Sequence, residues 1–290
     1  MPVHGDNLYA KINASPKYRD QQSQQYLKEI ERHYCIWVTE NEEIKGPLQE
    51  PNDNDPAKIK KRVAAFNKYK DFLDQQKYAE KFDSRSNLHS TVLEEFLEYL
   101  FRDLVRELDP SVLVGKSHAF KDIFFKGSNF LNFAANPRIE IEKKDHDFVI
   151  GVTVNANFST NSEQSTDQIH SFDLPIVAIE CKTYLDKTML EGASTAGNQI
   201  KIRNPDAMYV ICTEWLKLTD AVNLNKFDVD QIYVLRKQKN TDREFRFEET
   251  YSKNPIYPDV VEKLFQNVRD HLTRSWATSV AEKLETGILK

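Results

Sequence analysis

The chain has 290 residues, of which 40% are hydrophobic and 29% charged, and its formal net charge at pH 7 is −5. This length and composition fit a globular protein with one large core or two modest ones. No stretch approaches the roughly eighteen consecutive apolar residues of a transmembrane helix. The N-terminal residues lack the apolar core of a signal peptide. We therefore expect a protein of a bacterial-type cytoplasm that has no membrane partner.

Cysteine and glycine usage narrows the chemistry. The three cysteines, Cys35, Cys181 and Cys212, are odd in number and widely spaced, which indicates buried free thiols in a reducing compartment. The chain has only 8 glycines and no Gly-x-x-x-x-Gly-Lys segment, so we expect no nucleotide-binding phosphate loop. Cysteine and histidine also lack the spacing of a zinc site. The negative net charge still permits a nucleic-acid partner, because phosphates are bound by local basic patches.

The first 110 residues are predicted to be mostly helical. Helix formers fill 15–33, Asp55-Pro56 is a helix start, and 91–94 match a capping box whose helix ends near residue 109. The helix after Asp55 carries six cations, which either follow a phosphate backbone or form an ordinary solvated face. These candidate DNA-binding residues are Lys58, Lys60, Lys61, Arg62, Lys68 and Lys70.

From about residue 120 the pattern predicts strands, at 138–142, 147–154, 176–182, 208–213 and 231–235. Helices are predicted at 188–201, where a second capping box precedes a run of small residues, and at 258–276. The polar stretch 155–172 is either disordered or a loop whose Asn and Gln side chains bond base edges. The fold class that follows is α/β: a central mixed sheet flanked by helices, with an N-terminal helical region.

Charged residues at two strand ends predict a metal-dependent hydrolytic site. The apolar run 176–179 ends in Glu180-Cys181-Lys182, and alternation along a strand puts Glu180 and Lys182 on one face. If this strand pairs antiparallel with 147–154, Asp147 lies close to Lys182 and within reach of Glu180. Asp147, Glu180 and the backbone carbonyl of Cys181 are ligands suited to Mg²⁺. Lys182 would orient the nucleophile, help its deprotonation, or stabilise charge on a phosphorane. Asp145, with the same parity as Asp147, is the alternative acid.

Three segments of the chain resemble a known nuclease family. TVLEEFLEYLF, DHDFVIG and AIECKTYLDKTMLEGASTAGNQIK resemble the PD-(D/E)xK nuclease core and, more narrowly, the BbvCI-like type II restriction endonucleases. The resemblance covers roughly 85–215, and it implies a Mg²⁺-dependent endodeoxyribonuclease that cuts a short specific site. Residues 86–290 would form the nuclease core, and 1–85 a helical region for DNA recognition or subunit contact.

The resemblance also assigns roles to individual residues. It implies that Asp147 and Glu180 are the metal ligands and Lys182 the catalytic lysine, although His146 stands where the superfamily has its proline. A further acid of the first core helix would be Glu94 or Glu95, and the helical periodicity places Glu95 opposite the apolar face. Two residues that flank the helix at 188–201 either contact phosphate or are ordinary surface residues. They are Lys187 and Gln199.

Partners follow from the same resemblance. They are double-stranded DNA and a second, related subunit, because these enzymes are built from two different subunits; self-association is the alternative. Two other functions compete with a restriction endonuclease subunit. One is a repair or recombination nuclease with the same core, and the other is an inactive DNA-binding subunit. The intact set of Asp147, Glu180 and Lys182 argues against the inactive protein.

Overall fold

The computed structural model of the chain describes residues 2–14, 16–82, 86–162, 165–240 and 246–276, together with positions 281, 284, 285 and 287. The helices within these ranges are α1 (Val3–Asn13), α2 (Gln21–Glu43), α3 (Asp55–Leu73), α4 (Gln76–Lys81), α5 (Thr91–Leu108), α6 (Phe130–Ala135), α7 (Lys187–Arg203) and α8 (Pro258–Thr273). The strands are β1 (Leu113–Lys126), β2 (Arg138–Phe158), β3 (Gln168–Leu185), β4 (Met208–Leu216) and β5 (Gln231–Val234).

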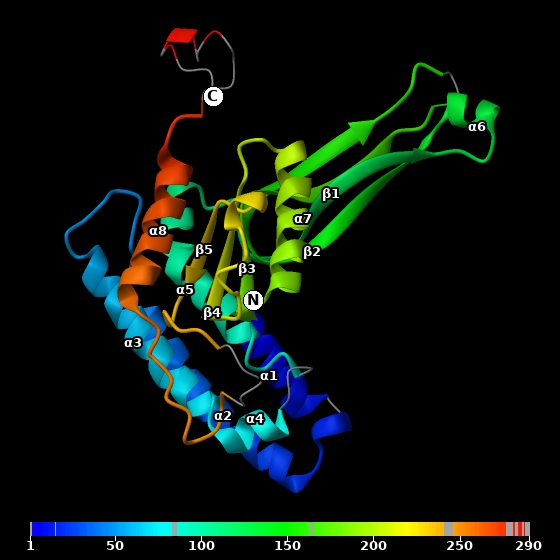
Figure 1. Ribbon diagram of the computed structural model, residues 1–290. Helices are drawn as coiled ribbons and strands as arrows, with labels where there is room; N and C mark the ends of the chain where they lie inside the picture. The colour runs from blue at the N-terminus through cyan, green and yellow to red at the C-terminus, as the bar shows by residue number, and fades with distance from the viewer. Residues whose placement is uncertain are drawn as a thin grey trace.

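The five strands form one mixed sheet in the order β1-β2-β3-β4-β5. The pairs β1–β2 and β2–β3 are antiparallel, whereas β3–β4 and β4–β5 are parallel. Figure 1 shows α7 on one face of this sheet and α5 and α8 on the other, with α1 to α4 gathered below. The predicted fold class, a mixed sheet flanked by helices and preceded by a helical region, is confirmed.

Alternation along β3 divides the core into two layers. Ala178 belongs to a cluster with the buried residues of α7, whereas Val177 and Ile179 belong to a larger cluster with α5 and α8. The small residues of α7 let it lie directly on the sheet, as predicted: a Cβ on Gly197 would meet the ring of Tyr209 at 3.0 Å. The side chain of Asp186, and not the predicted capping box, caps this helix by accepting the N–H of Met189 at 2.8 Å.

Two long hairpins form an arm that projects from the core, with α6 at its tip (Figure 1). The side chain of Gln168 bonds the backbone N–H of Ile139 at 3.0 Å and the carbonyl of Pro137 at 2.9 Å. The first residues of β2 therefore lie beside the start of β3, which pairs with the last residues of β2, so β2 turns back on itself midway. Gly151 lies where the register to β3 shifts, and a Cβ there would meet the carbonyl oxygen of Leu174 at 2.3 Å.

The arm corrects three sequence predictions. The strands expected at 138–142 and 147–154 are one strand, β2. The polar stretch 155–172 is largely paired strand, because β2 continues to Phe158 and β3 begins at Gln168. β1 has no counterpart among the predicted strands. The pairing of β1 with β2 shifts register twice, after Gly115 and after Phe120. These shifts interrupt the alternation of apolar and polar residues by which a strand is predicted from sequence.

The N-terminal helices share a core with the sheet. One hydrophobic cluster contains Leu8 of α1, Leu27 of α2 and Phe66 of α3 as well as residues of β2 and β3. The helix expected at 15–33 begins later and extends further, as α2, and α1 was not predicted. The helices expected after Asp55 and from residue 91 are α3 and α5. No described helix is long and apolar enough to cross a membrane. Cys181 and Cys212 are buried as expected, whereas Cys35 is exposed.

Candidate active site

Strand pairing brings Asp147, Glu180 and Lys182 together. The antiparallel register of β2 and β3 ends at the pair Phe148–Ile179, so the next residues, Asp147 and Glu180, lie where the two strands separate. The Nζ of Lys182 lies 2.7 Å from Oε1 of Glu180 and 3.2 Å from Oδ2 of Asp147. The backbone N–H of Cys181 donates to the same Oδ2 at 2.9 Å. The predicted proximity of these three side chains is confirmed.

The three side chains are mostly enclosed, with between 20% and 26% of each exposed. Burial raises the pKa of Asp147, and the attraction of Lys182 only partly opposes this effect. Burial also favours the neutral form of Glu180, but the Lys182 ammonium and the Tyr209 hydroxyl outweigh it and hold the pKa of Glu180 below its usual value. Burial lowers the pKa of Lys182, yet the two carboxylates raise it well above its usual value. Lys182 is therefore an ammonium at neutral pH.

A cavity of about 450 Å³ is lined by Asp147 and Lys182, whereas Glu180 is not part of its lining. Besides Asp147 and Lys182 it is lined by Glu94 of α5 and Lys116 of β1, whose Nζ lies 3.1 Å from Oε2 of Glu94. Burial, followed by the negative charge of Asp147, raises the pKa of Glu94 to about 7. The capping box expected at 91–94 is not formed, because the Glu94 side chain pairs with Lys116. Of the two candidate glutamates, Glu94 is the one that reaches the cavity.

Glu95 lies elsewhere, and its predicted placement opposite the apolar face is wrong. It is fully buried and accepts the backbone N–H groups of His4 and Gly5, at 2.9 and 3.0 Å, and the hydroxyl of Tyr34 at 2.9 Å. These N–H groups belong to the first turn of α1, which lacks a cap of its own, so Glu95 supplies the acceptors that this turn needs. Glu95 therefore joins α1 to α5 and lies outside the cavity.

Three further candidates do not line the cavity. Lys187 is exposed and lies 3.7 Å from Glu191, its neighbour one turn along α7. Gln199, also on α7, is half-buried. Asp145, the alternative acid, is 78% exposed and lies 2.6 Å from the ring of His118. His146, in the place of the expected proline, is buried, and burial lowers its pKa to about 4, which makes it a neutral residue near pH 7.

Two of the six cations predicted for the basic face of α3 are buried in the interior. Arg62 is fully buried, and its guanidinium bonds the backbone carbonyls of Asn41, Ile44 and Gly46. Lys70 is also fully buried and forms ion pairs with Asp74 and Glu214. Arg62 therefore joins α3 to the end of α2 and the segment after it, and Lys70 joins α3 to β4. Neither cation is available to DNA. The other four, Lys58, Lys60, Lys61 and Lys68, are at least partly exposed.

Sequence reasoning missed several residues of the site. Tyr209 on β4 donates its hydroxyl to Oε2 of Glu180 at 3.1 Å. Lys116 comes from the unpredicted strand β1, and Arg246 from a segment with no predicted element. Of these residues, only Tyr209 could have been placed from the sequence. In the strand predicted at 208–213 it alternates in step with Ile211, so both side chains lie on the face that α7 covers.

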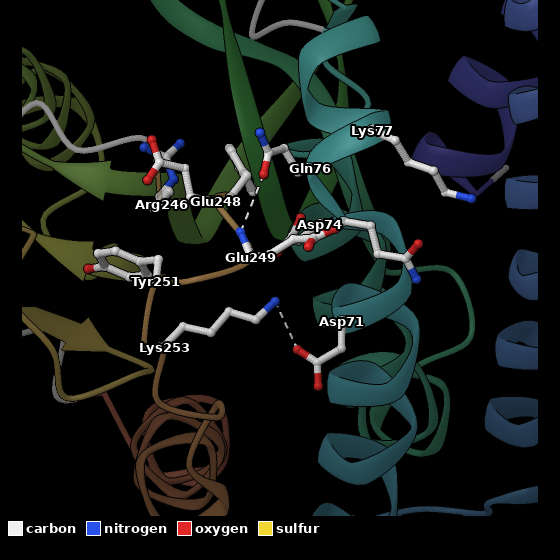
Figure 2. Close-up of a pocket in the computed structure, with 11 residues that line it drawn as sticks. Asp71, Asp74, Gln76, Lys77, Arg246, Glu248, Glu249, Tyr251 and Lys253 are labelled. Atoms are coloured by element: carbon white, nitrogen blue, oxygen red, sulfur yellow. Dashed lines mark hydrogen bonds and ion pairs between the residues drawn. The ribbon is translucent and has the colours of Figure 1, made fainter.

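A second cavity, of about 350 Å³, lies between α3, α4 and the segment 246–253. Figure 2 shows its charged lining, in which Lys253 pairs with Asp71 at 3.1 Å and the backbone N–H of Glu249 donates to Gln76. None of the predicted site residues lines it. Arg246 lines both cavities and so lies between them.

Comparisons with known proteins identify this architecture. The family model of the Bpu10I restriction endonuclease matches residues 85–289, and the resemblance drawn from 85–215 is confirmed. A solved structure described as the native BbvCI A2B2 tetramer at low resolution is similar in fold, with a TM-score of 0.67. Its sequence identity is 17%, and the match covers 94% of this chain and 97% of that chain. No curated protein matches this chain.

Proposed function

This chain belongs to the Bpu10I restriction endonuclease family, and we propose that it hydrolyses phosphodiester bonds of double-stranded DNA, with Mg²⁺, at the Asp147–Glu180–Lys182 site. One observation carries the proposal: two carboxylates from adjacent strands converge on a single cation, the Lys182 ammonium, at 2.7 and 3.2 Å. An ordinary ion pair on a solvated surface contributes little stability, so stability alone does not explain why two carboxylates converge on one lysine here.

The donor atoms suit Mg²⁺, which takes one or two carboxylates together with waters and phosphate oxygens. Asp147 and Glu180 would supply the carboxylates. The N–H of Cys181 points toward Asp147, and because the N–H and carbonyl of one strand residue point to the same edge, its carbonyl would face the metal too. The described residues contain no cluster of three or more His, Cys, Asp or Glu side chains suited to a metal, so water and phosphate oxygens would have to complete the coordination of Mg²⁺. When bound, Mg²⁺ would polarise the phosphodiester and lower the pKa of a bound water.

The residues of the chain would do the rest of the chemistry. Lys182 would orient the attacking water, help its deprotonation, or stabilise negative charge on the phosphorane. Tyr209 would hold the Glu180 carboxylate in place through its hydrogen bond. Lys116 and Glu94, which form an ion pair in the same cavity, would position the substrate backbone beside Asp147.

The assembly would contain two nuclease subunits. The described part of the chain carries one Asp–Glu–Lys set, and one such site cuts one strand, so a double-strand break needs a second site. The similar solved structure is described as an A2B2 tetramer, which supports a partner of a related but different sequence. A short asymmetric recognition site would suit such a pair, whereas a palindrome would suit two copies of this chain.

Plasmid cleavage tests the proposal. The chain is incubated with supercoiled plasmids and Mg²⁺, alone and with the candidate partner subunit, and the ends are mapped. We expect nicking or weak cutting by the chain alone, and double-strand cuts at one short sequence with the partner. Cuts at many unrelated sequences would instead identify a repair or recombination nuclease. Absence of any cleavage by the pair, with DNA binding retained, would identify an inactive DNA-binding subunit.

The Lys182→Ala variant tests the site itself. We expect it to bind DNA about as tightly as the wild type and to cleave none. Cleavage at the wild-type rate by this variant would remove Lys182, and with it the proposed site, from the mechanism.

A further inference from the structure

Arg246 enters the active-site cavity from a segment far along the chain. It lines the cavity that also contains Asp147 and Lys182, and it forms part of the wall of the second cavity as well, where Figure 2 draws it. Nothing in the chemistry proposed above uses this guanidinium. An arginine in a cavity that Asp147, Glu94 and two lysines also line needs a physical explanation, because burial lowers its pKa and therefore costs free energy.

Aromatic rings hold the guanidinium in place. Its central carbon lies 5.2 Å from the ring centroids of both Tyr184 and Trp215 and 4.9 Å from that of Phe247. Tyr184 comes two residues after Lys182 on β3, and alternation puts the two side chains on the same face. Stacking on aromatic faces fixes the plane of a guanidinium while its N–H edges stay free. Arg246 is therefore anchored to the strand that carries the catalytic lysine.

The positive charge of Arg246 has no carboxylate of its own within the described ranges. The carboxylates whose charge most raises its pKa are Glu214 and Asp74, and both already form ion pairs with other cations. Glu214 binds Lys70 at 2.9 Å and Arg236 at 3.0 Å, and Asp74 binds Lys70 at 3.2 Å. The Nε of Arg246 is buried without a hydrogen-bond partner. A buried polar group of this kind normally has a partner, and here the partner would be an anion that enters the cavity.

We propose that the Arg246 guanidinium binds a phosphate of the DNA backbone in the active-site cavity and so positions the strand that Lys182 helps to cleave. The inference rests on the proposed function. Arginine suits the task because its planar fork binds two oxygens of one phosphate at once. Arg246 acts as a positioning residue: it fixes where the backbone lies, while the reacting phosphodiester is held at Asp147 and Glu180.

The experiment compares three Arg246 variants in their salt dependence of DNA binding. Binding without cleavage is measured in the Lys182→Ala background, with a duplex that spans the mapped cut site, over a range of NaCl concentrations. Arg246→Met and Arg246→Gln should bind about 10- to 100-fold more weakly, since a hydrogen-bonded charge is lost. Their slope of log affinity against log salt should fall by about 0.9, the value of one phosphate contact. Arg246→Lys should keep the slope but bind about tenfold more weakly, because an ammonium lacks the fork.

A matched control separates this effect from a change of net charge. Lys239→Gln removes one positive charge from a half-exposed lysine that pairs with Asp220 and does not line the cavity. It should change neither the affinity nor the slope. Thermal unfolding of every variant shows whether packing against Trp215 and Tyr184 has been disturbed.

The outcomes distinguish the inference from the proposed function. If the wild-type protein with its partner cuts no plasmid, the proposed function fails and the inference fails with it. If the wild type cuts, but folded Met and Gln variants keep the wild-type slope, Arg246 only packs against the rings and the inference alone is wrong. Should both neutral variants fail to fold, Arg246→Lys decides: wild-type affinity would overturn the phosphate contact, and tenfold weaker binding with an unchanged unfolding midpoint would support it.

Discussion

Replacing Lys182 by methionine should destabilise the metal-free protein and increase its response to Mg²⁺. The ammonium lies 2.7 Å from Glu180 and 3.2 Å from Asp147, and at an effective dielectric constant of about 20 each contact has a gross attraction of roughly 5–6 kcal/mol. Desolvation of the three groups cancels most of this attraction. Removal of one partner from a buried pair costs about 3–5 kcal/mol, and since about a quarter of Lys182 is exposed, we expect about 3 kcal/mol.

Thermal unfolding near neutral pH measures this loss. A change of about 3 kcal/mol corresponds to a decrease of roughly 6 °C in the unfolding midpoint for a chain of this size. Mg²⁺ should raise the midpoint of the variant more than that of the wild type, because no ammonium competes for Asp147 and Glu180. Cleavage by the variant should fall by about 100- to 1,000-fold or more, the usual effect of losing one group that stabilises transition-state charge.

Lys201→Met is the matched control. Lys201 has nearly the same exposed fraction as Lys182, 27% against 26%, and pairs with one carboxylate, Asp230, at 2.6 Å. Its loss should lower the midpoint only slightly and leave both cleavage and the Mg²⁺ response unchanged. An equal rise of the midpoints of Lys182→Met and the wild type with Mg²⁺ would show that Asp147 and Glu180 do not share a metal.

Three other predictions follow from contacts outside the Lys182 ion pairs. Burial lowers the pKa of His4 to about 3. As the pH falls below about 6.5, His4 therefore binds a proton in the unfolded chain but not in the folded one, and the folded state loses stability. By pH 5 this loss is about 2 kcal/mol. The free energies of unfolding of the wild type and of His4→Gln, measured with denaturant, should therefore differ by about 2 kcal/mol less at pH 5 than at pH 7. A difference that does not change with pH would contradict this prediction. Gly151→Ala should cost about 2–3 kcal/mol or more, because its Cβ would lie 2.3 Å from the carbonyl oxygen of Leu174, and an unchanged unfolding midpoint would refute the tight bend of β2. Tyr209→Phe removes the hydroxyl that donates to Glu180 and should slow cleavage by about tenfold with unchanged DNA affinity, whereas wild-type cleavage rates would show that this hydrogen bond is not needed.

Local periodicity was enough to predict the elements that carry the site. The helical spacing of apolar residues in α3, α5 and α8 is a property of short segments, and these helices appear in the structure with few changes of boundary. The alternation of β3 is local too, but β3 begins eight residues before the predicted strand and ends three residues after it. The parity of Glu180 and Lys182 followed from the strand geometry alone. Antiparallel pairing with β2 then required Asp147 to lie close to them, and the structure has it there.

Residues that come from distant segments were not predictable in this way. Lys70 looked like a surface cation on α3, but its partner Glu214 lies on β4, 144 positions along the chain. Glu94 and Glu95 are adjacent in sequence, and only the packing of α1 against α5 decides that Glu95 binds the start of α1 while Glu94 faces the cavity. Lys116 depends likewise on the unpredicted strand β1.

The fold class, the family and the grouping of Asp147, Glu180 and Lys182 could be predicted from the sequence, because each depends on the repeat of a helix or strand or on one short motif. Which charges are buried, how β2 folds back into the arm, and that Arg246 reaches the cavity are visible only in the folded chain. Burial and ion pairing depend on contacts between segments far apart in the chain. Hydrophobic periodicity indicates which face of an element is buried, but it does not show which distant residue lies against it.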